Sequence, residues 1–188
     1  RLVKHPGTAI VDFTGSARFG AWVEQNAYPA LSYTETSGVN TVVLESMDDL
    51  ESVARSLATT MNLFSAQMCT SPQNIYVPRG GVTVGGRRVS VDEVCDAIVA
   101  AFRAVVAEPR RAASILATVQ SPATLDLVER MHDGGSRRGA VLLDSAPYAH
   151  PDFPAARTAT PLLLRVAPDA RDLYCEERFG PIGFVIET

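Results

Sequence analysis

Apolar residues recur along the chain at two different spacings, which separates the predicted strands from the predicted helices. Short apolar runs bounded by turn residues predict buried strands, and apolar residues at every third or fourth position predict helices. The predicted strands are 8–13, 30–34, 40–45, 74–77, 140–143, 161–166 and 182–186. The predicted helices are 17–28, 50–64, 90–105 and one that opens at 121 and is ended by the glycine pair 134–135. This alternation is typical of an α/β fold with a mainly parallel sheet.

Local signals add detail to this pattern. Ser90 and Glu93 have the spacing of a capping box, which predicts the start of a helix. Glycine pairs on either side of 82–84 predict a hairpin or an exposed loop. A phosphate cradle over 81–86 is the less favoured interpretation, because such glycine pairs more often form turns. The proline-containing stretch 144–160 is expected to be an irregular surface connection.

Composition narrows the class of protein. The 188 residues include 17 basic and 21 acidic side chains, a formal net charge of −4, and 46% of them are hydrophobic. These values favour one sizeable globular domain and exclude the basic surface of a nucleic-acid or membrane-surface binder. No apolar run reaches the roughly 20 residues of a membrane span, and no signal peptide is recognisable. Cys69, Cys95 and Cys175 cannot all pair, which favours a reducing, cytoplasmic compartment.

Metal and hydrolase chemistry lack their usual motifs. His5, His132 and His150 are far apart in the sequence, and no CxxC or HxxxH pattern occurs, so no metal site is predicted. The G-x-S-x-G motif of a hydrolase is also absent. Cys95 and Cys175 are interpreted as buried, inert thiols: Cys95 has apolar neighbours in a predicted helix, and two glutamates follow Cys175 and disfavour a thiolate.

Cys69 differs from the other two cysteines in its surroundings. It stands between a predicted helix and a predicted strand, and Pro72 favours an extended turn after it, so its sulfur is expected to face a cleft. A lone cysteine is more often buried and inert. Glu35 changes that balance, because it lies at a predicted turn between two strands, where α/β proteins place their working groups.

Four landmarks occur along the chain in a characteristic order. They are Phe13-Thr14-Gly15-Ser16, Glu35-x-x-Gly38-x-Asn40, Gln67-x-Cys69-Thr70 and Glu176-Glu177-Arg178-Phe179-Gly180-Pro181. Each motif is weak alone, but the ordered set and its intervals resemble the aldehyde dehydrogenase superfamily over essentially the whole chain. The stretches 36–41 and 67–74 are most similar to the branch that acts in phenylacetate breakdown. The resemblance implies a three-layer α/β sandwich with a mainly parallel sheet.

The resemblance also implies catalytic roles. Cys69 matches the nucleophile, whose thiolate adds to the aldehyde carbon so that a hydride can leave and a thioester forms. The backbone N–H of Cys69 would help to hold the oxyanion. Glu35 matches the general base that deprotonates the hydrolytic water. Because family members that acylate coenzyme A typically lack this base, Glu35 favours release of a free acid.

The cofactor implied by the resemblance is NAD or NADP. A helix N-terminus is expected to receive the pyrophosphate, and a later segment is expected to hold the nicotinamide ribose and to buttress the nicotinamide end. The residues that match these cofactor positions are Thr14, Gly15, Ser16 and Gly20 for the helix, and Glu177 and Phe179 for the later segment.

The chain departs from the family pattern in sequence and in length. Ser37 and Ala66 stand where glycine is usual, and Val39 stands where lysine is common. These departures remove no reacting group. Because family chains are much longer, the sequence is expected to be a fragment, with 1–36 as the C-terminal end of the nucleotide-binding domain and 37–188 as a truncated catalytic domain.

The sequence therefore predicts the catalytic portion of an NAD(P)-dependent aldehyde dehydrogenase. Its expected substrate is an aldehyde of aromatic-acid catabolism, with a CoA-linked semialdehyde as one option. The parent protein is expected to be a homo-oligomer, and the fragment alone is expected to be inactive. Two alternatives stay open: a non-catalytic structural or interaction module that keeps the fold, and a CoA-acylating aldehyde dehydrogenase.

Overall fold

The computed structural model describes residues 1–36 and 38–188, which form two compact units. Unit 1 is Arg1–Gly38 and unit 2 is Val39–Thr188. The division falls two residues after the expected domain boundary at 36/37. Ser37, which begins the expected catalytic domain, lies outside the described residues.

Unit 1 is a strand–helix–strand motif preceded by the short helix η1 (Leu2–Lys4). Strands β1 (Ile10–Gly15) and β2 (Leu31–Thr36) pair in parallel and flank helix α1 (Ala17–Asn26). Ser16 begins the helix, because its Oγ accepts a hydrogen bond of 3.3 Å from the N–H of Phe19. The motif therefore places the carboxyl end of β1 directly before a helix N-terminus.

Unit 2 is built on a five-stranded sheet in the order β3-β5-β10-β9-β8. Neighbouring pairs among the first four strands are parallel, and β8 runs antiparallel to β9. The bounds are β3 (Asn40–Val43), β5 (Pro72–Val77), β10 (Ile182–Glu187), β9 (Leu162–Val166) and β8 (Gly139–Leu143). The predicted mainly parallel sheet is confirmed.

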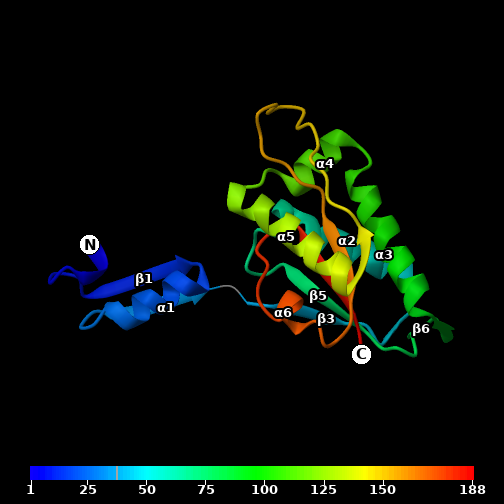
Figure 1. The fold of residues 1–188 in the computed structure, drawn as a ribbon, viewed down its shortest axis with the longest axis horizontal. Coiled ribbons are helices and arrows are strands. Elements are labelled where there is room, and N and C mark those ends of the chain that lie inside the picture. The colour runs from blue at the N-terminus through cyan, green and yellow to red at the C-terminus, as the bar shows by residue number, and fades with distance from the viewer. Residues whose placement is uncertain (37) are drawn as a thin grey trace. The chain divides into compact units, whose positions relative to one another are not determined.

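Helices cover both faces of this sheet (Figure 1). Helices α2 (Leu50–Asn62) and α3 (Val91–Val106) pack on the face that carries Ile75, Leu163 and Val185. The other core contains Val128 of helix α5 (Pro122–Arg138), Leu173 of helix α6 (Arg171–Tyr174), and sheet residues such as Leu164 and Phe184. Because β9 and β10 are buried on both faces, they are nearly continuous apolar runs. The predicted three-layer sandwich is confirmed.

A smaller sheet lies beside this core. It joins β4 (Ser46–Met47), β6 (Val82–Val84) and β7 (Arg87–Val89), with β6 and β7 antiparallel. Gly85 and Gly86 have φ values of +53° and +81°, which a hairpin turn requires. The predicted hairpin is confirmed, and these glycines serve the turn.

The predicted end of the last long helix is wrong. Helix α5 continues through the glycine pair to Arg138. A Cβ on Gly135 would lie 2.6 Å from both Cδ atoms of the fully buried Leu164, and one on Gly134 would lie 2.8 Å from Cδ2 of Leu173. The glycines therefore permit close approach of the helix to its neighbours and do not end it.

Other differences concern short elements. The predicted strand 40–45 stops at Val43, and β4 follows as a separate strand. Helices α4 (Pro109–Leu116) and α6 were not predicted.

The predicted capping box at the start of α3 is confirmed, because Ser90 Oγ accepts a hydrogen bond from the N–H of Glu93 at 3.2 Å and Glu93 Oε2 accepts one from the N–H of Ser90 at 2.9 Å.

We predict that Gly135→Ala destabilises the protein although alanine favours helices. The propensity gain is about 1 kcal/mol, whereas overpacking against a buried leucine costs about 1–3 kcal/mol. Urea unfolding should give a net loss of about 1 kcal/mol. The exposed neighbour provides a control, since Ser136→Ala should change the free energy of unfolding by less than about 0.5 kcal/mol. Equal or greater stability of Gly135→Ala would contradict the packing argument.

Candidate active site

The loop that carries Cys69 is held by hydrogen bonds from a distant part of unit 2. Ser65 Oγ donates to the carbonyl of Leu116 at 2.7 Å. The Gln67 amide bridges the same region, because its Nε2 donates to the carbonyl of Thr118 at 3.0 Å and its Oε1 accepts from the N–H of Gln120 at 2.9 Å. The glutamine of the Gln-x-Cys motif thus joins the loop to the segment after α4 through hydrogen bonds.

Cys69 lies in a turn and is exposed. The turn is closed by a 3.1 Å hydrogen bond from the N–H of Ser71 to the carbonyl of Met68. Asn40 Nδ2, at the start of β3, donates to the carbonyls of Cys69 (2.6 Å) and Ser71 (3.2 Å). The thiol is therefore accessible while the backbone that carries it is fixed. Asn40 belongs to the second landmark, but its function in positioning this loop was not predicted.

The backbone before Cys69 is left-handed at three consecutive residues. The short helix η2 (Leu63–Ala66) follows α2, and within it Phe64, Ser65 and Ala66 have φ values of +53°, +53° and +52°. Residues with a Cβ adopt this region only at an energetic cost. The requirement for positive φ explains why glycine is usual at the position of Ala66.

Glu35 lies in a strand and not at the predicted turn. It is the penultimate residue of β2, is paired with Thr14, and is exposed. The predicted strand 30–34 ended one residue before Glu35, whereas pairing with β1 continues β2 to Thr36. Glu35 belongs to unit 1 and Cys69 to unit 2.

The predicted pyrophosphate residues gather at one end of unit 1. Thr14 and Gly15 end β1, Ser16 caps α1, and all three are exposed. No acidic residue occupies the first turn of this helix, where unpaired N–H groups and the helix dipole favour an anion. Gly20 is instead buried, and a Cβ there would lie 2.6 Å from Cγ2 of Thr36. These residues fit a phosphate group, with Gly20 bringing α1 close to β2.

The predicted nicotinamide residues lie between α6 and β10 in unit 2. Glu177 is half-buried, and Phe179 is 42% exposed. Between them, the side chain of Arg178 is turned inward with 13% exposure. Its Nε donates to the carbonyl of Leu173 at 2.8 Å, and its Nη2 donates to the carbonyl of Asp172.

The other two cysteines differ from each other. Cys95 is buried, and the loss of solvation raises the pKa of its thiol to about 11, as expected for an inert cysteine. Cys175 is exposed, so its predicted burial is wrong. The residue lies immediately after the short helix α6, where the chain is at the surface.

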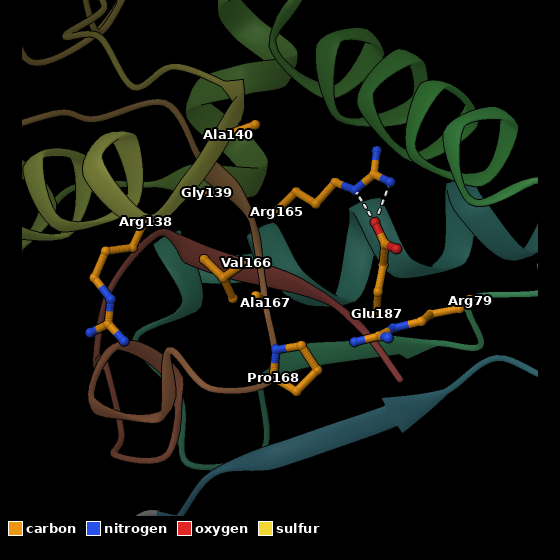
Figure 2. A pocket seen from close by; sticks show the side chains of 9 residues that line it. All are labelled: Arg79, Arg138, Gly139, Ala140, Arg165, Val166, Ala167, Pro168 and Glu187. Atoms are coloured by element: carbon orange, nitrogen blue, oxygen red, sulfur yellow. Dashed lines mark hydrogen bonds and ion pairs between the residues drawn. The ribbon is translucent and has the colours of Figure 1, made fainter.

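A cationic hollow at the carboxyl ends of β9 and β10 is a separate feature (Figure 2). Arg165 lies in this hollow and donates hydrogen bonds to Asp92, at 2.6 Å, and to Glu187. The bonds to these two carboxylates raise the pKa of the guanidinium. Arg138 pairs with Asp172 outside the hollow. These two cations are thus compensated by carboxylates of unit 2, which indicates a structural ion-pair cluster.

The described residues contain neither a cluster of metal ligands nor a membrane-spanning helix. Within 1–36 and 38–188, no group of three His, Cys, Asp or Glu side chains is arranged to hold a metal ion. No helix among these residues has the length and apolar character needed to cross a membrane.

The architecture is that of an α/β protein with an exposed cysteine on a loop that is held by hydrogen bonds. The family model described as aldehyde dehydrogenase matches residues 1–188, and the chain belongs to the aldehyde dehydrogenase family. Its similarity to the phenylacetate branch stays a prediction.

Individual relatives agree with this assignment. The structure of an NAD-dependent aldehyde dehydrogenase from Burkholderia multivorans is 40% identical, with a TM-score of 0.93, over 99% of this chain and 33% of that one. A curated Staphylococcus haemolyticus relative, with aldehyde dehydrogenase in its name, is 24% identical over 98% of this chain and 38% of its own length. An NAD-dependent benzaldehyde dehydrogenase from Corynebacterium glutamicum shares the fold, at 19% identity and a TM-score of 0.72, over 99% of this chain and 38% of that one. The chain thus spans between 33% and 38% of the length of these relatives.

We predict that Ala66→Gly stabilises the protein. Left-handed backbone costs a residue with a Cβ about 1 kcal/mol, and glycine removes that cost, so urea unfolding should show a gain of about this size. Ala58→Gly is the matched control, because Ala58 is also buried but lies inside α2, where glycine should cost about 1 kcal/mol. A loss of stability in both variants would argue against strain at Ala66.

Proposed function

We propose that the full-length protein oxidises an aldehyde to a carboxylic acid, with NAD or NADP as the hydride acceptor. The observation that carries the proposal is the exposed Cys69 on a loop fastened by Asn40, Ser65 and Gln67. A nucleophile must reach its substrate and yet stay in a fixed position, and this arrangement meets both needs.

In the proposed reaction, Cys69 acts first. Its thiolate forms a C–S bond with the aldehyde carbon, and the carbonyl π electrons move to the oxygen. The backbone N–H of Cys69 is suited to donate a hydrogen bond to this oxyanion. NAD(P), when bound, supplies a hydride acceptor, so that loss of hydride restores the C=O bond and leaves a thioester on Cys69.

Glu35 is proposed to complete the turnover. Its carboxylate takes a proton from water, and the resulting hydroxide adds to the thioester carbon. The C–S bond then breaks, the Cys69 thiolate leaves, and the carboxylic acid is released. Glu35 is exposed near the end of β2, where water can reach it. A general base at this position favours hydrolysis over transfer of the acyl group to coenzyme A.

Two regions are proposed to hold the dinucleotide. The N-terminus of α1, with Thr14, Gly15 and Ser16, is suited to the pyrophosphate, and buried Gly20 lets this helix pack closely. Glu177 and Phe179 are proposed to hold the nicotinamide ribose and to buttress the nicotinamide end.

Finer assignments rest on sequence similarity. We propose an aldehyde from aromatic-acid catabolism as the substrate, with a CoA-linked semialdehyde as one form of it, because 36–41 and 67–74 are similar to the phenylacetate branch. A cytoplasmic homo-oligomer is proposed for the parent protein. Residues 1–188 alone are proposed to be inactive, since relatives are about three times as long.

Cys69→Ala should abolish catalysis in the full-length protein. Removal of a nucleophile leaves no covalent route, so aldehyde-dependent NAD(P)H formation should fall at least about a thousandfold. Absorbance at the reduced nicotinamide band measures this rate. Cys175→Ala, at another exposed cysteine, should retain activity. Unchanged turnover in Cys69→Ala would reject the proposal and leave a non-catalytic module or another nucleophile.

Glu35→Gln should separate the two halves of the reaction. Without the base, thioester hydrolysis should slow by a factor of about 100 or more, whereas the first hydride transfer should persist. Stopped-flow absorbance should show a burst of about one NAD(P)H per site, followed by slow turnover. Glu45→Gln serves as a control at an exposed carboxylate beyond β3. Normal steady-state turnover in Glu35→Gln would require a different base.

A further inference from the structure

Two buried amide side chains follow Pro72 at the start of strand β5, directly after the loop of Cys69. Gln73 is 6% exposed and Asn74 is 1% exposed. Polar groups buried to this degree destabilise a protein unless they are hydrogen-bonded. Their partners therefore reveal what these residues do.

Both amides bond backbone groups at the end of α6 and just after it, about a hundred residues later in the chain. Gln73 Nε2 donates to the carbonyls of Tyr174 and Glu176, both at 3.1 Å, and Gln73 Oε1 accepts from the N–H of Arg178 at 2.6 Å. Asn74 Nδ2 donates to the carbonyl of Tyr174 at 3.0 Å. Gln73 thus bonds the peptide groups on either side of Glu177.

The same contacts define how the segment 176–179 presents its side chains. Arg178 is turned inward and fastened through both its backbone and its guanidinium. Its neighbours are more accessible, with Glu177 half-buried and Phe179 exposed. Fixing Arg178 therefore limits the freedom of the two residues that flank it.

We propose that Gln73 is a positioning residue for the nicotinamide half of the cofactor. It acts through the segment 176–179 and does not itself touch the cofactor. The inference rests on the proposed function, because it takes Glu177 and Phe179 as the residues that meet the nicotinamide ribose. Since β5 begins three residues after Cys69, one strand end fixes both the nucleophile loop and this segment.

The test compares two ligands in the full-length protein. Gln73→Met keeps the length of the side chain but removes its hydrogen bonds to the segment. Calorimetry should show NAD binding weakened by about tenfold or more, with ADP binding almost unchanged, because ADP lacks the nicotinamide ribose. KM for NAD should rise in the same way, whereas the rate of Cys69 alkylation without cofactor should stay the same.

Controls separate this effect from a general loss of structure. Thr158→Val removes a buried hydroxyl that bonds the backbone of Tyr148 and not the segment 176–179, so it should not alter the ratio of NAD to ADP affinity. Asn74→Leu removes the bond to the carbonyl of Tyr174, which ends α6 two residues before the segment, and should give a smaller selective loss. If Gln73→Met does not fold, Asn74→Leu decides the question.

The outcomes distinguish the two levels of the proposal. Absence of NAD(P)-dependent aldehyde oxidation by the unmodified full-length protein would reject the proposed function. An active protein whose Gln73→Met variant has an unchanged ratio of NAD to ADP affinity would overturn the positioning role alone. Equal weakening of NAD and ADP would also overturn it, since that result indicates a general structural effect.

Discussion

The position of strand β5 is the constraint on which the rest of unit 2 depends. The strand is hydrogen-bonded to β3 on one edge and to β10 on the other, and Ile75 and Val77 are fully buried. Ile75 and Val77 belong to the core on one face and Tyr76 packs against the core on the other, so helices cover the strand on both faces. Its start at Pro72 consequently determines where the preceding loop must end.

The loop of Cys69 is ordered by hydrogen bonds between side chains and backbone groups of several parts of unit 2. An exposed side chain such as that of Cys69 cannot be held by burial, so the surrounding carbonyl groups are fixed instead. Asn40 bonds two of them from β3, and Gln67 connects the loop to 118–120. The left-handed residues before the loop are strained, and these contacts offset that strain. Accessibility of the thiol and rigidity of its backbone are therefore compatible.

Much of the fold could be predicted, because its signals are local. The capping box at Ser90, the hairpin at 82–89 and the apolar runs of β9 and β10 depend on neighbouring residues and on strong periodicity. The glycine pair in α5 misled the prediction, because glycine also permits close packing, and only the position of Leu164 distinguishes that use from a helix end. The predicted strand also ended before Glu35, because only its pairing with Thr14 of β1 shows that β2 continues through this residue.

The sequence by itself determined the chemistry available to this protein: a thiol between a helix and a strand, a carboxylate near a strand end, and a helix N-terminus free of acidic residues. Ordered motifs carry this information, since side-chain type and spacing are properties of the chain. Only the tertiary structure decided which of these groups are accessible and what holds them. Gln73 meets the backbone of Arg178 across 105 positions of the sequence, and Asn40 meets Cys69 across 29. Such partners come together only when the packed sheet brings distant segments into contact, and no local pattern encodes them.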